Sequence, residues 1–336
     1  MPAIRRFINQ LAERENIDQV FLVADKQLRA NRNGNLYLQL RLTDKSGSLT
    51  GMLWNANDSV FNSVQTGNYL RVAGTTQIYN GQLQMIVTRI EPSDPRQIDE
   101  QDFVAVSSEE IDRLAKRLTE LLRGLRNVHL RNLAECFLSD DEFMRKFTTA
   151  PAGVKNHHAY RGGLLAHVVS LMEVCRVVAP LYPELDAELL LMGAFLHDAG
   201  KIDELVYDRE LAYSDEGQLI GHVIMVLGTL EDKVAESERL SAEKFPVELL
   251  LRLKHIIVSH HGEYEFGSPK LPMTLEAIAL HLLDNLDAKL YSVAQIMKED
   301  AGGDSAWTSY NQALGRKFFK GSVANGERGT RNGERA

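Results

Sequence analysis

The spacing of the apolar side chains changes near residue 90, and this change constrains the fold more than any other feature. Before it they alternate with polar ones, as in the segment 35–42 (NLYLQLRL), whereas after about residue 108 they recur every three or four positions. A period of two is typical of a strand with one buried face, and a period near 3.6 is typical of an amphipathic helix. The chain of 336 residues is long enough for two cores. The sequence therefore predicts a multidomain protein, all-β at first and all-α afterwards.

Turn signals divide the first part into short strands. Asn33-Gly34 and Asn80-Gly81 are two of these signals, and residues 55–64 have the pattern of a short helix capped near Asn57. Five strands with a helix between the third and the fourth match the OB-fold, a small Greek-key barrel that often binds single-stranded nucleic acid. We expect this barrel at residues 1–92.

The second part is predicted to be helical. Residues 91–108 contain two prolines and several acids, and we assign 93–108 as a linker. Ser107-Ser108-Glu109-Glu110 has the pattern of a helix cap, and that helix would run to about Gly124. Further helices are expected at 129–139, 140–148, 162–179, 184–198, 219–236, 246–260 and 273–298, which places the helical domain at 109–320. The polar, glycine-rich residues 321–336 are typical of a disordered tail.

The net charge of −8 is unevenly distributed. Residues 1–95 carry +2 and residues 316–336 carry +4, so the stretch between them carries −14. An acidic middle is expected of a cation-binding core, although solvated helix faces produce it equally well. The charge pattern therefore permits a nucleic-acid partner without requiring one.

Targeting and redox features favour a cytoplasmic protein without a membrane partner. Uninterrupted apolar runs such as 189–196 are far shorter than the ~20 residues that span a bilayer, and the N-terminus has no cleavable leader pattern. Cys136 and Cys175 lie far apart in apolar surroundings. We expect both thiols to be reduced, small core residues.

Histidines and aspartates occur beside strongly apolar residues in the second part. His197-Asp198 and His260-His261 each end an apolar helix. A polar group at such a place is costly unless it is paired or binds metal. A lone histidine there is usually a satisfied core residue, and we expect His281 to be one or to support a ligand. The doublets favour divalent first-row metals, for which a shared aspartate can bridge two ions about 3.5–4 Å apart.

The order of these residues resembles the H…HD…D pattern of the HD phosphohydrolase superfamily, whose fold is an all-α bundle. The resemblance implies that one ion is held by His167, His197, Asp198 and Asp284. It implies a second ion, bridged by Asp198 and held by His222, His260 and His261. Lys201, in the sequence HDAGK, matches a lysine that approaches the scissile phosphate in related subfamilies.

A narrower resemblance covers roughly residues 15–300. The segment from His157 to Ser170 (HHAYRGGLLAHVVS), followed by FLHDAGK and GQLIGHV, looks like the YhaM-type 3′-5′ exoribonucleases, which also carry an N-terminal OB-fold. This resemblance implies a 3′-5′ exonuclease that hydrolyses single-stranded RNA, and possibly DNA, to mononucleotides. It also implies two divalent ions, with Mn²⁺ favoured and Mg²⁺, Co²⁺ or Fe²⁺ as alternatives.

A cluster of hydrogen-bond donors precedes the helix that carries His167. His157, His158, Tyr160 and Arg161 could bind an anionic substrate, and Arg161 could fork two phosphate oxygens. We therefore predict Asp198, Lys201 and Arg161 as the catalytic residues, with Lys201 also binding substrate. A polar loop that only caps a helix is the alternative.

The barrel offers aromatic and basic candidates for holding a strand by stacking and charge. They are Phe21, Tyr37, Trp54, Tyr69, Tyr79, Arg29, Arg32, Arg41 and Arg71. Each aromatic taken singly is more often a core residue than a stacking platform.

Three other functions stay open at this point. An HD-type enzyme could act on a small nucleotide or cyclic dinucleotide, although the barrel argues against it. A nucleic-acid-binding scaffold could have lost catalysis, although the complete ligand set argues against that. The barrel could instead contact a protein or a second copy of the chain, so a homo-oligomer is possible.

Overall fold

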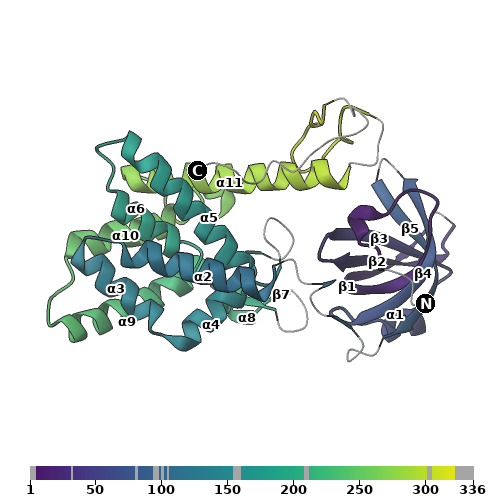
Figure 1. Cartoon of the computed structure of the whole chain (residues 1–336), viewed down its shortest axis with the longest axis horizontal. Helices are drawn as coiled ribbons and strands as arrows, with labels where there is room; N and C mark the ends of the chain where they lie inside the picture. The colour runs from purple at the N-terminus through teal and green to yellow at the C-terminus, as the bar shows by residue number, and fades with distance from the viewer. Residues whose placement is uncertain are drawn as a thin grey trace.

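The structure is a computed structural model, and it consists of a β-barrel followed by a bundle of helices (Figure 1). It describes residues 5–31, 33–79, 82–93, 98–99, 102–103, 106–153, 160–207, 212–300 and 305–321. The predicted all-β barrel and the predicted all-α domain are both present.

Five strands close the barrel in the order β1-β2-β3-β5-β4, with β4 pairing back to β1. They are β1 (Asn16–Ala30), β2 (Leu36–Asp44), β3 (Gly47–Trp54), β4 (Tyr69–Tyr79) and β5 (Gln82–Pro92), and a short 3-10 helix η1 (Ile8–Gln10) precedes them. Strands β3 and β5 run parallel, and the other pairs run antiparallel. Helix α1 (Asp58–Ser63) lies between β3 and β4, and the Asn57 side chain accepts a hydrogen bond from the Val60 N–H, as the cap prediction required.

Successive side chains along a barrel strand face alternately the core and the outer surface. Leu38, Leu40 and Leu42 of β2 are fully buried, whereas Tyr37 and Arg41, which alternate with them, face outward and are partly exposed. Gly74 lies where the β4–β5 register shifts, and a Cβ atom there would overlap the carbonyl oxygen of Ile86. The two strands can approach so closely because residue 74 has no side chain.

The helical part begins at Ser108, where the Ser107 side chain caps the first helix as predicted. Its longer helices are α2 (Ser108–Arg123), α3 (Val128–Leu138), α4 (Asp141–Thr149), α5 (Gly163–Val178), α6 (Ala187–Leu196), α9 (His222–Ser241), α10 (Val247–Ser259) and α11 (Leu275–Glu299). Their bounds lie within a few residues of those predicted. The prediction missed the short elements α7 (Lys201–Glu204), β6 (Leu205–Val206), β7 (Ala212–Tyr213), α8 (Asp215–Leu219), η4 (Ala179–Leu181) and η5 (Tyr264–Phe266).

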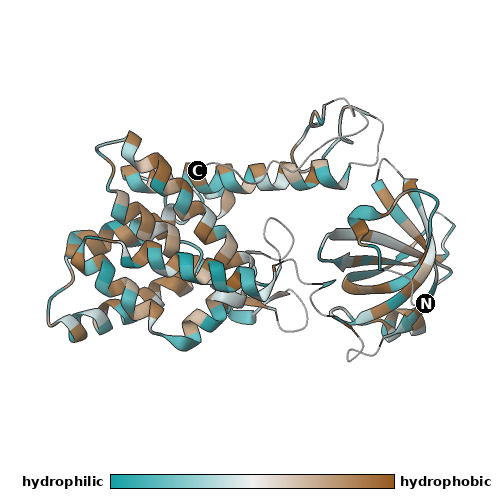
Figure 2. Cartoon of the chain, viewed as in Figure 1, coloured by the Kyte–Doolittle hydropathy of each residue, from teal (hydrophilic) through white to brown (hydrophobic). Residues whose placement is uncertain are grey.

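Helix α6 is the centre of the bundle, and nearly all of its residues are buried. It packs against α5, α10 and α11, and its apolar character is visible in Figure 2. A Cβ atom at Gly193 would lie 2.7 Å from Ile256, so the glycine permits close packing of α6 on α10. Phe195 joins a group of aromatic rings from α3 and α4, including Phe137 and Phe147. Burial of this helix fixes the position of His197 and Asp198 at its end.

One helical stretch, Gly163–Leu181, is long and apolar enough to cross a membrane by length and composition. Polar residues interrupt this stretch, so it is not one of the uninterrupted apolar runs of the sequence. Half of the stretch is buried inside the bundle, and it carries the fully buried His167. These features are those of a core helix of the bundle.

Two segments differ from the predictions. Asp102 and Phe103, inside the predicted linker, pack on the barrel: Asp102 pairs with Lys45 at 3.3 Å, and the Phe103 ring lies 4.9 Å from that of Tyr69. Residues 305–321, predicted to belong to an all-helical domain, are not helical and contain two isolated β-bridges instead. The predicted disordered tail lies outside the described residues except for Gly321.

Replacement of two glycines by alanine should change the stability of the protein in opposite directions. Gly74→Ala forces β4 and β5 apart, so we expect it to destabilise the barrel by about 1–3 kcal/mol. Gly228→Ala in α9 meets nothing within 4 Å, so we expect it to stabilise the bundle by about 0.5–1 kcal/mol. Thermal unfolding of the full chain measures both effects. A Gly74→Ala protein as stable as the wild type would contradict the close approach of the two strands.

Candidate metal centre

The ends of four helices and the middle of two others bring the predicted ligands together. His197 and Asp198 follow the last residue of α6, and Lys201 begins α7. His222 is the first residue of α9, and His260-His261 follow α10. Within their helices, His167 of α5 and Asp284 of α11 lie on faces turned toward these ends.

The first group consists of His167, His197 and Asp284, whose ligand atoms lie within 4.8 Å of one another. The Nε2 atom of His167 is 3.2 Å from Oδ1 of Asp284 and 3.4 Å from Nε2 of His197. Both histidines are fully buried. Two imidazole nitrogens and a carboxylate oxygen at such spacing could hold one divalent cation.

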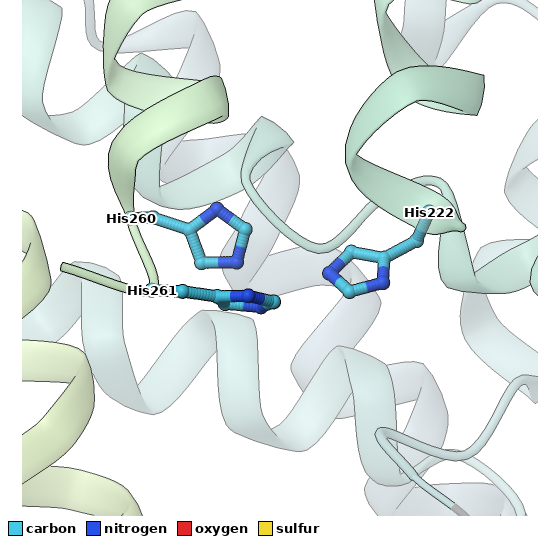
Figure 3. Close-up of side chains that lie close together, drawn as sticks. All are labelled: His222, His260 and His261. Atoms are coloured by element: carbon cyan, nitrogen blue, oxygen red, sulfur yellow. The ribbon is translucent and has the colours of Figure 1, made fainter. Parts of the chain in front are cut away.

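The second group consists of His222, His260 and His261, whose rings face a common point (Figure 3). Their ligand atoms also lie within 4.8 Å of one another. Nε2 of His222, Nε2 of His260 and Nδ1 of His261 are buried and have no hydrogen-bond partner among the described residues. Leaving three polar atoms buried and unpaired is costly. A cation at this point would satisfy the Nε2 atoms of His222 and His260, and all three residues offer a ligand atom close to it, so they fit a metal ion.

The carboxylate of Asp198 lies between the two groups. Its Oδ2 atom is 3.4 Å from Nε2 of His197 and 3.8 Å from Nε2 of His167. Its Oδ1 atom is 3.4 Å from Nε2 of His222 and 3.7 Å from Nε2 of His260. One carboxylate therefore offers one oxygen to each group, which is the arrangement of a bridging ligand.

Lys201 compensates the buried charge of Asp198. Its Nζ atom donates to Oδ2 of Asp198 at 2.7 Å and to the carbonyl oxygen of Ala152 at 2.7 Å. Burial raises the pKa of Asp198, but Lys201 and the neighbouring His197 lower it more, so it lies well below its usual range. Burial lowers the pKa of Lys201, and the Asp198 carboxylate outweighs this effect and raises it. The carboxylate is thus ionised and the ammonium is charged.

Backbone carbonyl groups fix the orientation of two imidazoles. Nδ1 of His197 lies 2.9 Å from the carbonyl oxygen of Ala194, and Nδ1 of His260 lies 2.7 Å from that of Ile257. A carbonyl oxygen can only accept, so Nδ1 carries the proton in each ring. The Nε2 atom that faces the site is then free to bind metal when the ring is neutral.

Two carboxylates fix the orientation of the rings of His167 and His222. Neither carboxylate was predicted from the sequence. Nδ1 of His167 lies 3.0 Å from Oδ2 of Asp287, and Nδ1 of His222 lies 2.9 Å from Oε1 of Glu204. Glu204 also accepts a hydrogen bond from the backbone N–H of His222 at 3.0 Å. Asp287 follows Asp284 by three positions on one helix, a spacing that places both on the same helical face and could have indicated this role.

The pKa of His167 in the first group is shifted in the opposite direction from those of His260 and His261 in the second. Burial lowers the pKa of His167, but hydrogen bonds to Asp284 and Asp287 outweigh it and raise the pKa to about 9. Burial and the neighbouring imidazoles, among them that of His197, lower the pKa of His260 well below its usual value. Burial and His222 likewise lower the pKa of His261. Without metal, His167 therefore carries a proton, whereas His260 and His261 are neutral.

Glycines allow the elements around the site to approach closely. A Cβ atom at Gly200 would overlap the carbonyl oxygen of His222, and one at Gly262 would overlap the ring of His281. Gly262 also has a φ of 81°, which favours glycine. His281 lies with Nδ1 2.9 Å from the carbonyl oxygen of His260. It thus supports the backbone of a predicted ligand, one of the two roles expected for it.

The predicted substrate-binding residues are only partly described. His157 and His158 lie outside the described residues. Tyr160 is partly buried, and burial together with the neighbouring Tyr291 and Asp287 raises its pKa. Arg161 is exposed at the start of α5, and no hydrogen bond or ion pair joins it to the cluster among the described residues.

On the barrel, three of the candidates form one row across the outer face. Arg29 of β1 pairs in register with Tyr37 of β2, which pairs with Trp54 of β3. The rings of Tyr37 and Trp54 lie 5.1 Å apart, and Trp54 is 45% exposed. Arg41 lies further along the same face of β2, with a buried Nε atom that has no partner among the described residues. Tyr79 is exposed at the end of β4.

The other candidates have different surroundings. Phe21 was wrong as a contact residue, because it points into the barrel and is fully buried in the core. Tyr69 packs against Phe103, and Arg71 forms an ion pair with Asp18 at 2.7 Å. Arg32 lies outside the described residues.

Comparisons with known proteins agree with these two parts. Residues 22–93 match the OB-fold nucleic acid binding domain, and residues 164–289 match the HD domain. The solution NMR structure of the second OB-fold domain of replication protein A from Methanococcus maripaludis aligns with 26% of this chain and 94% of that domain, at 22% identity and a TM-score of 0.22. Over 308 residues the chain is 33% identical to the 3′-5′ exoribonuclease YhaM of Bacillus velezensis and to that of Bacillus subtilis. Each alignment covers 91% of this chain and 95% of the relative. The chain therefore belongs to the family of YhaM 3′-5′ exoribonucleases.

Proposed function

We propose that this protein is a metal-dependent 3′-5′ exonuclease that hydrolyses single-stranded RNA to mononucleotides. The observation that carries the proposal is the position of Asp198, with one oxygen facing each of two groups of metal-binding side chains. The family relationship supports the reaction and its direction. DNA remains a possible additional substrate.

The residues that would hold the cations are the seven predicted ones. His167, His197 and Asp284 would hold one ion, His222, His260 and His261 would hold the other, and Asp198 would bridge them. Divalent cations there supply Lewis acidity and lower the pKa of a water molecule toward neutrality. We propose Mn²⁺ as the ion, as the resemblance to the family implies, and the mixed imidazole and carboxylate donors are compatible with it. Mg²⁺, Co²⁺ and Fe²⁺ remain alternatives.

Charged side chains at the site would hold the scissile phosphate. Lys201 uses two of its three N–H groups on Asp198 and Ala152, which leaves one for a phosphate oxygen. The exposed guanidinium of Arg161, at the start of the helix that carries His167, would bind the same group. Tyr160, His157 and His158 stay candidate substrate-binding residues. Positive charge held in place there would stabilise the developing charge on the phosphate.

The outer face of the barrel would bind the rest of the strand. The row of Arg29, Tyr37 and Trp54 combines a guanidinium group with two neighbouring rings. Bases stack on exposed rings, and positive charge attracts the backbone, without dependence on sequence. The barrel would thus retain RNA while its 3′ end is hydrolysed.

Two further properties are proposed, the cellular compartment and the oligomeric state. Cys136 and Cys175 are both free and buried, in keeping with a reduced, cytoplasmic protein. The exposed residues Leu282, Leu286 and Leu290 of α11 follow each other at helical spacing. Such a stripe supports association with a second copy of the chain.

The experiment that tests the function uses RNA labelled at its 5′ end. With Mn²⁺ we expect a ladder that shortens one nucleotide at a time and pauses at stable hairpins, because paired bases must separate before their phosphates reach a buried site. Gel electrophoresis resolves these products. Cleavage of circular RNA, or immediate internal fragments, would show an endonuclease. Turnover of cyclic dinucleotides without any action on RNA would favour the small-substrate alternative.

Substitution of the proposed bridging ligand Asp198, or of the proposed ligand His261, should cause loss of metal and of activity together. We expect two Mn²⁺ ions per wild-type chain and one per His261→Gln chain. Asp198→Asn should be more than about 100-fold less active, because loss of even a hydrogen-bond partner of a metal ligand lowers metal affinity or activity 10–100-fold. Elemental analysis of the protein counts the ions, and circular dichroism checks the fold. His129→Gln is the matched control, because His129 lies against Phe245, away from the site. An Asp198→Asn protein with wild-type activity would refute the assignment.

Metal binding should release a proton at neutral pH. The pKa of His167 is raised to about 9 in the metal-free protein, so this ring is charged at pH 7.5 and must lose its proton to bind a cation. We expect the calorimetric enthalpy of Mn²⁺ binding to depend on the ionisation enthalpy of the buffer, with a slope of about one proton. The slope should fall toward zero as the pH rises above about 9 and should be lost in His167→Gln, but not in His129→Gln. Equal enthalpies in all buffers at pH 7.5 would contradict this account.

A further inference from the structure

A compact element follows α11 and lies outside both regions that match known domains. In this element, Ser305–Gly321, the Thr308 N–H donates to the carbonyl oxygen of Phe318 at 2.8 Å, and the Asn311 N–H donates to that of Arg316 at 2.9 Å. Two β-bridges join its arms. The turn between them contains Gly315, whose φ of 63° favours glycine. The element is therefore ordered by its own backbone.

A buried ion pair fixes this element to the end of α11. Oδ1 of Asp300 accepts a hydrogen bond from Nζ of Lys320 at 2.8 Å, and its Oδ2 accepts one from the Ser309 N–H at 2.8 Å. The side chains of Asp300 and Lys320 are less than 10% exposed. Removing one partner of a buried pair is strongly destabilising, so the pair holds the two arms at a set position on the helix.

Three aromatic side chains of the element are left in solvent. Trp307 is 50% exposed, Tyr310 is 61% exposed and Phe319 is 58% exposed. The rings of Trp307 and Phe319 lie 5.0 Å apart. An ordered element that exposes rings instead of burying them has a surface suited to a partner.

The charge of the element favours an anionic partner. Ser305–Gly321 contains three basic residues and no acidic one, although the whole chain carries −8. Lys320 is neutralised by Asp300, whereas Arg316 and Lys317 are exposed. A second copy of this element would bring like charges together, which disfavours self-association. Exposed rings beside exposed cations, without carboxylates, are the combination by which proteins bind single-stranded nucleic acid.

We propose that the element binds single-stranded RNA, with bases stacked on Trp307, Tyr310 and Phe319 and phosphates held by Arg316 and Lys317. The site would hold nucleotides on the 5′ side of the one being hydrolysed, so this inference rests on the proposed exonuclease function. Stacking on these rings requires unpaired bases, so duplex RNA would not bind there.

Binding is measured separately from hydrolysis, with the full-length protein, fluorescent oligouridine and EDTA. The Trp307→Ala/Tyr310→Ala variant should bind about fivefold more weakly or worse, because each stacked base contributes about 1–3 kcal/mol. The Arg316→Gln/Lys317→Gln variant should reduce the salt dependence of binding by about 1.4 in logarithmic slope, because two phosphate contacts are lost. Tyr182→Ala, which removes a similarly exposed ring outside the element, should bind like the wild type.

A second measurement locates the contact. RNA that contains 5-iodouridine should cross-link by light to Trp307, Tyr310 or Phe319, as identified by mass spectrometry of the peptides. Since Arg316 and Lys317 are exposed, their variant should keep the wild-type unfolding temperature. Weaker binding together with these cross-links supports the proposal.

Other outcomes overturn the proposal, and they differ from failure of the enzyme function. If the wild type degrades RNA but all variants bind RNA equally well, the surface is wrong and the exonuclease stands. If the wild type degrades no RNA, the proposed function fails, and the binding assay in EDTA still decides the surface. If the aromatic variant changes only the oligomeric state measured by light scattering, the surface contacts another copy and the RNA proposal is refuted.

Discussion

The carboxylate of Asp198, buried between two groups of histidines, is the constraint on which the helical part depends. Moving such a charge out of water costs several kcal/mol unless it is compensated. Here Lys201 donates to one oxygen, and imidazoles from four different helices surround both. The ends of α6, α9 and α10 must therefore meet at one point. Close approach at Gly200 makes the meeting of two of these segments possible.

The two groups offer chemically different surroundings to a cation. Around the first, Asp284 and the shared Asp198 add oxygen donors and negative charge to two imidazoles. The second contributes three imidazoles and only the shared carboxylate. Carboxylate oxygens suit harder ions such as Mn²⁺ and Mg²⁺, whereas imidazole suits softer ones. The two positions would therefore differ in affinity and in selectivity, and a change in Asp198 would alter both.

Much of the fold could be predicted, and so could the cluster of histidines and aspartates, because both leave strong signals in the sequence. Period-two alternation marks the barrel, and polar doublets such as His197-Asp198 are conspicuous at the end of an apolar helix. Glu204 could not be found in this way, because an acid on a short helix usually faces solvent, whereas the spacing of Asp287 from Asp284 could have indicated its role. Strands of two residues, such as β6 and β7, are too short to show any period. Phe21 was a candidate for stacking because it is aromatic. Whether an aromatic side chain of the barrel faces the core or the solvent depends on the strand register, which the sequence does not show.

The length of helix α11 would determine how long an RNA must be to reach both of its ends. Asp284 and Asp287 lie at the metal centre, and Asp300 at the far end of the same helix anchors the element with the exposed rings. From Asp287 to Asp300 an α-helix rises about 20 Å, and its length is set by its backbone hydrogen bonds. An RNA that reaches across this span would touch both places, and a shorter one would touch only the candidate metal centre. Hydrolysis would then slow once the remaining strand is shorter than the helix, and short oligonucleotides would be released before they are consumed.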